Sequence, residues 1–158
     1  MPKLERLSRL ADLLERDAEV TSRFDLTDWG TFETKRTGFL GLKKVSCNTT
    51  ACAVGLACIS GEFEADGLDY RVTRDNQLVP EYAGAANFAA VNRFFGLEQA
   101  DSNYLFYVDS YEGATRGPAA AKAVSARLRE FVAKHSSEEK HATTVADIKR
   151  RALEPASA

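Results

Sequence analysis

A chain of 158 residues with 21 basic and 23 acidic side chains carries a formal net charge of −2, which gives no electrostatic reason to bind nucleic acid or an anionic membrane. This length suits one domain, which buries about 70 per cent of its unfolded surface and needs no disulfide scaffold. The first residues are charged every few positions, and no long apolar run follows them. We therefore expect a cytoplasmic protein without a signal peptide or a membrane-spanning segment.

Helical spacing opens the chain. Leu4, Leu7, Leu10 and Leu14 recur three or four residues apart with charged residues between them, which predicts an amphipathic helix. A short turn follows and carries Trp29, the only tryptophan of the chain. We expect Trp29 to pack on a helix of small residues that comes later in the sequence.

A polar and basic segment from Thr31 to Val45 then has the composition of an exposed loop insertion. Its glycines are not placed as in a phosphate-binding loop before a helix, so we expect a solvated loop. The alternative is a loop that grips an anion or a partner. The candidate binding residues of the loop are Lys35, Arg36, Lys43 and Lys44.

The segment from Thr49 to Ser60 predicts a buried helix, because small and apolar residues occupy every side of it. Gly55 falls inside this helix, where glycine costs about 0.8 to 1.0 kcal/mol relative to alanine. We therefore expect another backbone or an aromatic ring to lie against Gly55.

The second half of the chain predicts a small hairpin and more helices. Alternation from Leu68 to Val79 indicates the hairpin, and helical spacing resumes on both sides of Gly96. A helix opens at Pro118 and weakens beyond His135, a last short helix runs from Thr144 to Leu153, and residues 154–158 form a disordered tail. The predicted fold is a predominantly helical α+β domain over residues 1–153, with four or five helices around one buried central helix.

Three cysteines, an odd number, fall within twelve residues of one another, so we expect reduced thiols. Cys47 is the candidate nucleophile, because a thiolate at a helix N-terminus is stabilised by the helix dipole and by free amide groups. Asn48 and Thr49 beside it, together with Trp29, are candidate binding residues. A thiol enzyme also needs a histidine base, and the chain has only two histidines, both distant in sequence.

The sequence gives little support for a metal site or for DNA binding. One Cys-x4-Cys pair with distant histidines does not supply the four ligands of a zinc site, so we expect no metal and no other cofactor. The helix after Gly96 resembles the second helix of a helix-turn-helix. No Lys or Arg occurs from Glu98 to Gly113, however, so this helix would repel DNA.

Four short motifs carry a family resemblance: Phe24-Asp25-Leu26 with Trp29, then Cys47-Asn48-Thr49-Thr50-Ala51-Cys52-Ala53-Val54-Gly55-Leu56-Ala57, Phe94-Phe95-Gly96-Leu97 and Tyr104-Leu105-Phe106. Together they resemble a set of small uncharacterised bacterial and phage proteins. That set has a Cys-Gly-Thr-x-x-Cys-x-x-Gly-x-Ala helix start after a tryptophan, and a later Phe-Gly-Leu helix pair. Asn48 replaces the expected glycine. The resemblance supports the fold and implies no activity.

Two functional classes follow. We expect a non-catalytic protein-interaction or accessory module whose partner is another protein, with no role for nucleic acid or membrane. The alternative is a thiol-dependent hydrolase or redox enzyme centred on Cys47. The sequence leaves the oligomeric state open.

Overall fold

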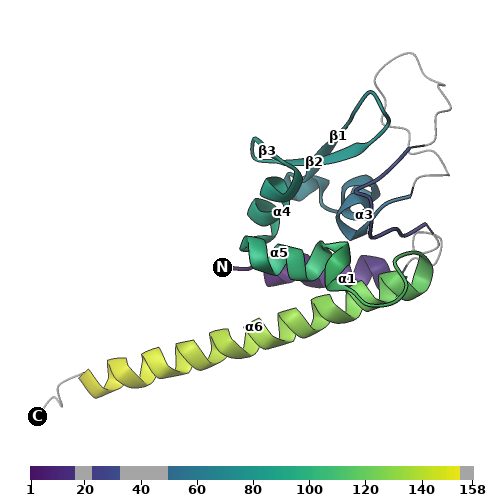
Figure 1. Cartoon of the computed structure of the whole chain (residues 1–158). Helices are drawn as coiled ribbons and strands as arrows, with labels where there is room; N and C mark the ends of the chain where they lie inside the picture. Colours follow the sequence, from purple (N-terminus) through teal and green to yellow (C-terminus); the bar gives the residue numbers. More distant parts are fainter. Residues whose placement is uncertain (17–22, 33–49, 154–158) are drawn as a thin grey trace, which may run out of the picture.

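The computed structural model of the chain describes residues 1–16, 23–32 and 50–153 (Figure 1). Five α-helices and one three-stranded antiparallel sheet lie within these residues, which confirms the predicted mostly helical α+β fold. The helices and strands are α1 (Leu4–Arg16), α3 (Ala53–Ser60), β1 (Asp69–Val72), β2 (Leu78–Tyr82), β3 (Ala85–Ala86), α4 (Asn87–Phe95), α5 (Gln99–Phe106) and α6 (Gly117–Leu153).

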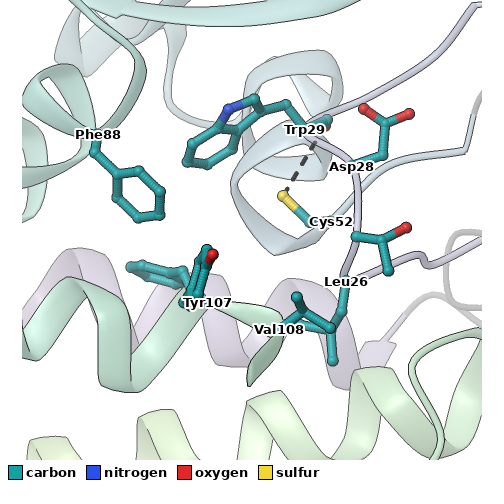
Figure 2. A pocket seen from close by; sticks show the side chains of 9 residues that line it. Leu26, Asp28, Trp29, Cys52, Phe88, Tyr107 and Val108 are labelled. Carbon is teal, nitrogen blue, oxygen red and sulfur yellow. Dashed lines mark hydrogen bonds between the residues drawn. The ribbon is translucent and has the colours of Figure 1, made fainter. Parts of the chain in front are cut away.

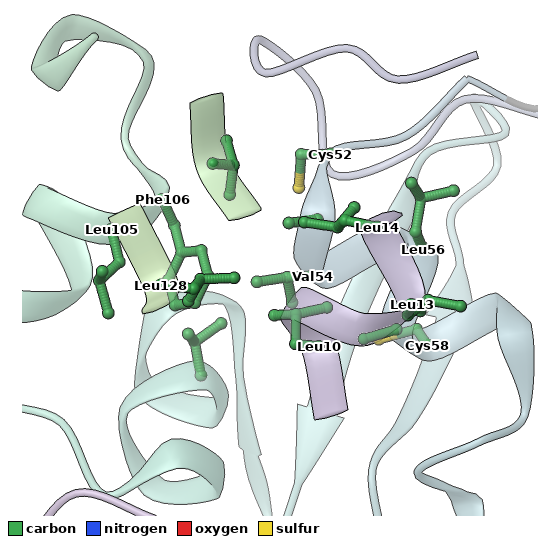
Figure 3. Close-up of a cluster of buried hydrophobic side chains, with 14 of the residues drawn as sticks. Leu10, Leu13, Leu14, Cys52, Val54, Leu56, Cys58, Leu105, Phe106 and Leu128 are labelled. Atoms are coloured by element: carbon green, nitrogen blue, oxygen red, sulfur yellow. The ribbon is translucent and has the colours of Figure 1, made fainter. Parts of the chain in front are cut away.

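Helix α3 is the buried centre of the domain, as predicted. Six of its eight residues are buried, and apolar side chains from α1, α5 and α6 converge on it (Figure 3). The packing combines small residues on α3 with leucines on α1 and α6. Hydrophobic burial of this kind is the main favourable term in folding.

The predicted start of this helix at Thr49 is wrong: α3 begins at Ala53. Thr50 and Ala51 are extended, because they form isolated β-bridges with Thr31 and Phe24. The amide of Thr31 donates to the carbonyl of Thr50 at 2.9 Å. Because these bridges hold Thr50 and Ala51 in an extended conformation, the helix can begin only after Cys52, which is extended and takes the N-cap position.

The predicted hairpin is confirmed and is longer than expected. Strands β1 and β2 pair antiparallel, with Asp69 opposite Glu81, and a tight turn then adds β3 to the other edge of β2. The sheet rests on α4, where Tyr82 meets Phe94 edge to face with ring centroids 5.1 Å apart. Helix α4 ends as predicted at Gly96, whose φ of 65° is left-handed.

Helix α6 corrects the prediction of two separate helices after Pro118. It runs unbroken for 37 residues, because no glycine or proline interrupts the sequence from Ala119 to Leu153 and nothing else ends the hydrogen-bond ladder. Its first half packs along α1, where Arg129 forms an ion pair with Glu15 at 2.9 Å. No described helix, α6 included, is long and apolar enough to cross a membrane.

Candidate functional site

Most of the predicted site residues lie outside the part of the chain that the structure describes. These are the candidate nucleophile and its neighbours, and all four basic residues of the loop: Cys47, Asn48, Thr49, Lys35, Arg36, Lys43 and Lys44. Trp29 is described and half-buried, and it lies beside the start of α3. Trp29 is therefore the one predicted site residue whose surroundings the structure describes.

The backbone of Trp29 lies directly on α3. A β-carbon placed on Gly55 would stand 1.6 Å from the carbonyl oxygen of Trp29, so only glycine fits there. The predicted close approach to Gly55 is confirmed. One turn earlier, the amide of Cys52 donates to the carbonyl of Asp28 at 2.8 Å, which fixes the segment around Trp29 against the helix start.

The ring of Trp29 borders a cavity of about 170 Å³ at the start of α3 (Figure 2). Phe88 from α4 meets it edge to face, with ring centroids 4.9 Å apart, and Tyr107 stands 6.4 Å from Phe88. Three aromatic rings from three segments of the chain thus form one wall. Cys52 contributes its thiol to the same cavity.

The Cys52 thiol lies in an environment that disfavours its thiolate form. Burial raises its pKa to about 11, because a charged thiolate would lose its hydration there, and backbone hydrogen bonds offset this only in part. The thiol lies 4.0 Å from the carbonyl oxygen of Trp29, to which it donates a long hydrogen bond. None of the described residues that line the cavity is a histidine.

The carboxylate in the cavity, that of Asp28, already has hydrogen-bond donors. Asp28 accepts hydrogen bonds from the amide of Gly30 at 3.2 Å and from the hydroxyl of Thr31, so its carboxylate holds the turn. A pocket for a small-molecule ligand typically holds roughly 300 to 1,000 Å³, well above the volume found here.

Across residues 1–16, 23–32 and 50–153, no three His, Cys, Asp or Glu side chains are grouped so that they could hold a metal ion. His135 stacks on Phe131 with ring centroids 4.0 Å apart, and its Nδ1 lies 3.0 Å from the carbonyl oxygen of Phe131. His141 is exposed on α6.

A second candidate surface is the end of α6, which runs past the rest of the described domain (Figure 1). Every residue from 137 to 153 is exposed, and we call this stretch the helical extension. Three large apolar side chains on it face solvent: Val145 is 37% exposed, Ile148 is 61% and Leu153 is 82%. Val145 and Ile148 are three residues apart, so they lie next to each other on one side of the helix.

None of the predicted site residues falls on the helical extension. Its spacing is readable in the sequence, because Ala142, Val145, Lys149 and Ala152 follow one another at intervals of three and four residues. Alanine or lysine stands at three of these four positions, which weakens the pattern. The prediction of a separate helix from Thr144 also missed that this stretch continues the helix of Phe131.

No family model, curated protein or solved structure matches the chain.

Proposed function

We propose that this protein is a non-catalytic protein-interaction module that binds a protein partner through its helical extension. The observation that carries the proposal is the exposure of residues 137–153 as a continuous helix with Val145 and Ile148 uncovered. Most helices in proteins gain their stability from packing of an apolar side, so binding that covers Val145 and Ile148 would stabilise this exposed stretch. In the bacterial or phage setting that the family resemblance implies, the module would act as an accessory factor.

The chemistry of the two surfaces supports a protein partner over nucleic acid or a membrane. The helical extension carries both signs of charge, with Glu138 and Glu139 near its beginning and Arg150 and Arg151 near its end. A nucleic-acid or membrane surface would instead call for a uniformly basic face. The protonated Cys52 thiol at the start of α3 supports a non-catalytic role.

The test compares two single substitutions on opposite sides of the helical extension. Val145→Asp places a charge on the exposed apolar side, and Thr143→Asp places the same charge on the far side of the same helix, since two residues correspond to about 200° of rotation. Quantitative affinity capture with the full chain as bait should lose its bound protein with Val145→Asp and keep it with Thr143→Asp. Equal capture by both variants would contradict the proposal.

The alternative function, a thiol-dependent hydrolase or redox enzyme centred on Cys47, makes a different prediction. A fast-reacting thiolate at Cys47 well below neutral pH would support it, since catalytic cysteines have a lowered pKa. The alkylation experiment described below separates the two functions.

A further inference from the structure

The three aromatic rings beside the cavity at the start of α3 are inclined to one another rather than stacked. The rings of Trp29 and Phe88 meet at 63°, and those of Phe88 and Tyr107 meet at 61°. Figure 2 shows these rings on one side of the cavity, with Asp28 and Val108 on the other. Trp29 and Phe88 are half-buried and Tyr107 is exposed, so the aromatic wall is partly open to solvent.

The charge at this cavity is negative. Among the described residues that line it, Asp28 is the one with a charged side chain. Its carboxylate accepts hydrogen bonds from the amide of Gly30 and the hydroxyl of Thr31, which are both neutral groups. The charge acts inside the cavity: burial raises the pKa of the Cys52 thiol, and the nearby charge of Asp28 adds to this rise. A field that disfavours a thiolate favours a cation.

Aromatic rings attract cations as well, because the face of a ring is the negative end of its quadrupole. The same protein shows this contact close by. The guanidinium carbon of Arg127 lies 3.6 Å from the ring centroid of Tyr111 and 4.5 Å from that of Tyr104. Tyr104 and Tyr107 are both 47% exposed, but Tyr104 lies under Arg127, whereas Tyr107 lines the cavity.

The size of the cavity limits the cation that fits. A volume of about 170 Å³ corresponds to roughly five or six water-sized groups, since a water molecule occupies about 30 Å³ in the liquid. A trimethylated ammonium group has this size. A bare ammonium group would lose its hydration in such a cavity, whereas methyl groups contact Leu26, Phe106 and Val108 favourably.

We propose that the cavity beside Trp29 binds a methylated ammonium group, held by the aromatic wall and by the negative charge of Asp28. Rings around a methylated cation are a known mode of recognition. The inference goes beyond the proposed function and does not depend on the helical extension. The same chemical group occurs in free quaternary amines and in trimethylated lysine side chains, so the experiment includes both.

The first test is a titration of the full chain with choline chloride. Trp29 is the only tryptophan, so its indole N–H gives a single assignable NMR signal. This signal should shift in a saturable way with a Kd on the order of 1 mM, because so small a ligand offers few contacts. Sodium chloride at the same ionic strength is the blank. The neutral analogue 3,3-dimethyl-1-butanol has carbon in place of nitrogen, and it should bind about tenfold more weakly or not at all.

Substitution of Tyr107 tests the aromatic wall. Tyr107→Leu keeps an apolar side chain but removes the ring, and it should weaken choline binding by about fivefold. Tyr107→Phe retains the ring and should keep the Kd. The matched control is Tyr104→Leu, which removes an equally exposed tyrosine outside the cavity and should leave the Kd unchanged.

Substitution of Asp28 tests the charge. Asp28→Asn keeps an oxygen acceptor for the turn and removes the negative charge, so choline binding should weaken by about fivefold while binding of the neutral analogue stays the same. Asp101→Asn removes the same charge from a residue of α5 that does not line the cavity, and it should have no effect. Thermal melting of each variant checks that the domain is folded.

Three results would overturn the inference: no saturable shift with choline, equal binding of choline and its neutral analogue, or an unchanged Kd in a folded Tyr107→Leu. A short peptide that contains trimethyllysine identifies the source of the group. Tighter binding of this peptide than of choline would support a protein ligand, whereas binding of choline alone would support a free quaternary amine.

Discussion

The carbonyl oxygen of Trp29 occupies the place where a side chain on Gly55 would begin, 1.6 Å from the position of its β-carbon. This contact joins the segment 23–32 to α3. Two backbone hydrogen bonds hold the same segment against the residues before α3: the amide of Asp25 donates to the carbonyl of Ala51 at 3.0 Å, and the amide of Cys52 donates to the carbonyl of Asp28 at 2.8 Å. Gly55 lowers the intrinsic stability of the helix, but its missing side chain allows the segment around Trp29 to pack against the helix.

Gly55→Ala should destabilise the protein by about 3 kcal/mol or more, the upper end of the usual overpacking cost, because the new methyl group meets rigid backbone atoms. The free energy of unfolding from urea denaturation measures this directly. An unchanged denaturation midpoint would contradict the close approach of Trp29 to α3.

Gly30→Ala provides the matched comparison. A β-carbon on Gly30 would lie 3.0 Å from the β-carbon of Leu78 and 3.3 Å from one of its methyl carbons. The methyl group can move away and the remaining overlap is slight, so the loss should be about 1 kcal/mol. We expect Gly30→Ala to unfold at a higher urea concentration than Gly55→Ala.

The contact between α1 and α6 should weaken in acid. Hydrogen bonds from Arg129 and from Ser125 lower the pKa of Glu15 from 4.5 to about 2. The folded pKa lies below the unfolded value, so this contribution is complete above pH 4.5 and is lost as the pH falls toward 2. The groups are largely exposed, so the contribution is about 1 kcal/mol or less.

Arg129→Met should raise the pKa of Glu15 toward its ordinary value, because the largest cause of the shift is removed. An NMR titration of the Glu15 carboxyl measures this change. Arg150→Met is the control, since Arg150 pairs with Asp147 at 3.5 Å within the helical extension. A Glu15 pKa that stays near 2 in Arg129→Met would disprove the proposed cause.

Cys52 and Cys58 should react with a thiol reagent only when the protein unfolds. Both are buried, and the pKa of Cys52 is raised to about 11, so the native rate should stay low and climb only in strongly alkaline solution. Measuring the alkylation rate against pH on native protein, with Cys47→Ser as the control, assigns any fast phase. A fast phase near pH 5 that disappears in Cys47→Ser would favour the thiol enzyme.

Hydrogen exchange should divide α6 into two parts. Amides from Ala120 to Phe131 belong to the buried half and should exchange slowly, whereas those of the helical extension should exchange fast in dilute protein. Binding of a protein partner to residues 137–153 should increase their protection. Slow exchange along the whole helix in dilute protein would show that the helical extension is stable without a partner.

Local patterns in the sequence determined several features by themselves. The leucines of α1 predicted an amphipathic helix, the small residues around Gly55 predicted a buried one, and Gly96 predicted the end of α4. Each of these follows from residues close together in the chain, because periodicity and backbone preference act within a few residues. The close approach to Gly55 could also be predicted, since an interior glycine costs stability unless something lies against it.

The remaining features depended on residues far apart in the sequence. The start of α3 moved from Thr49 to Ala53 because Thr31 and Phe24 pair with the residues before it, and no local pattern contains those bridges. The aromatic wall of Trp29, Phe88 and Tyr107 comes from three separate segments. The sequence alone determined where apolar residues recur at helical spacing, and with this most of the helices. Only the tertiary structure decided that α6 runs antiparallel to α1 and continues past the beginning of α1, which leaves residues 137–153 exposed.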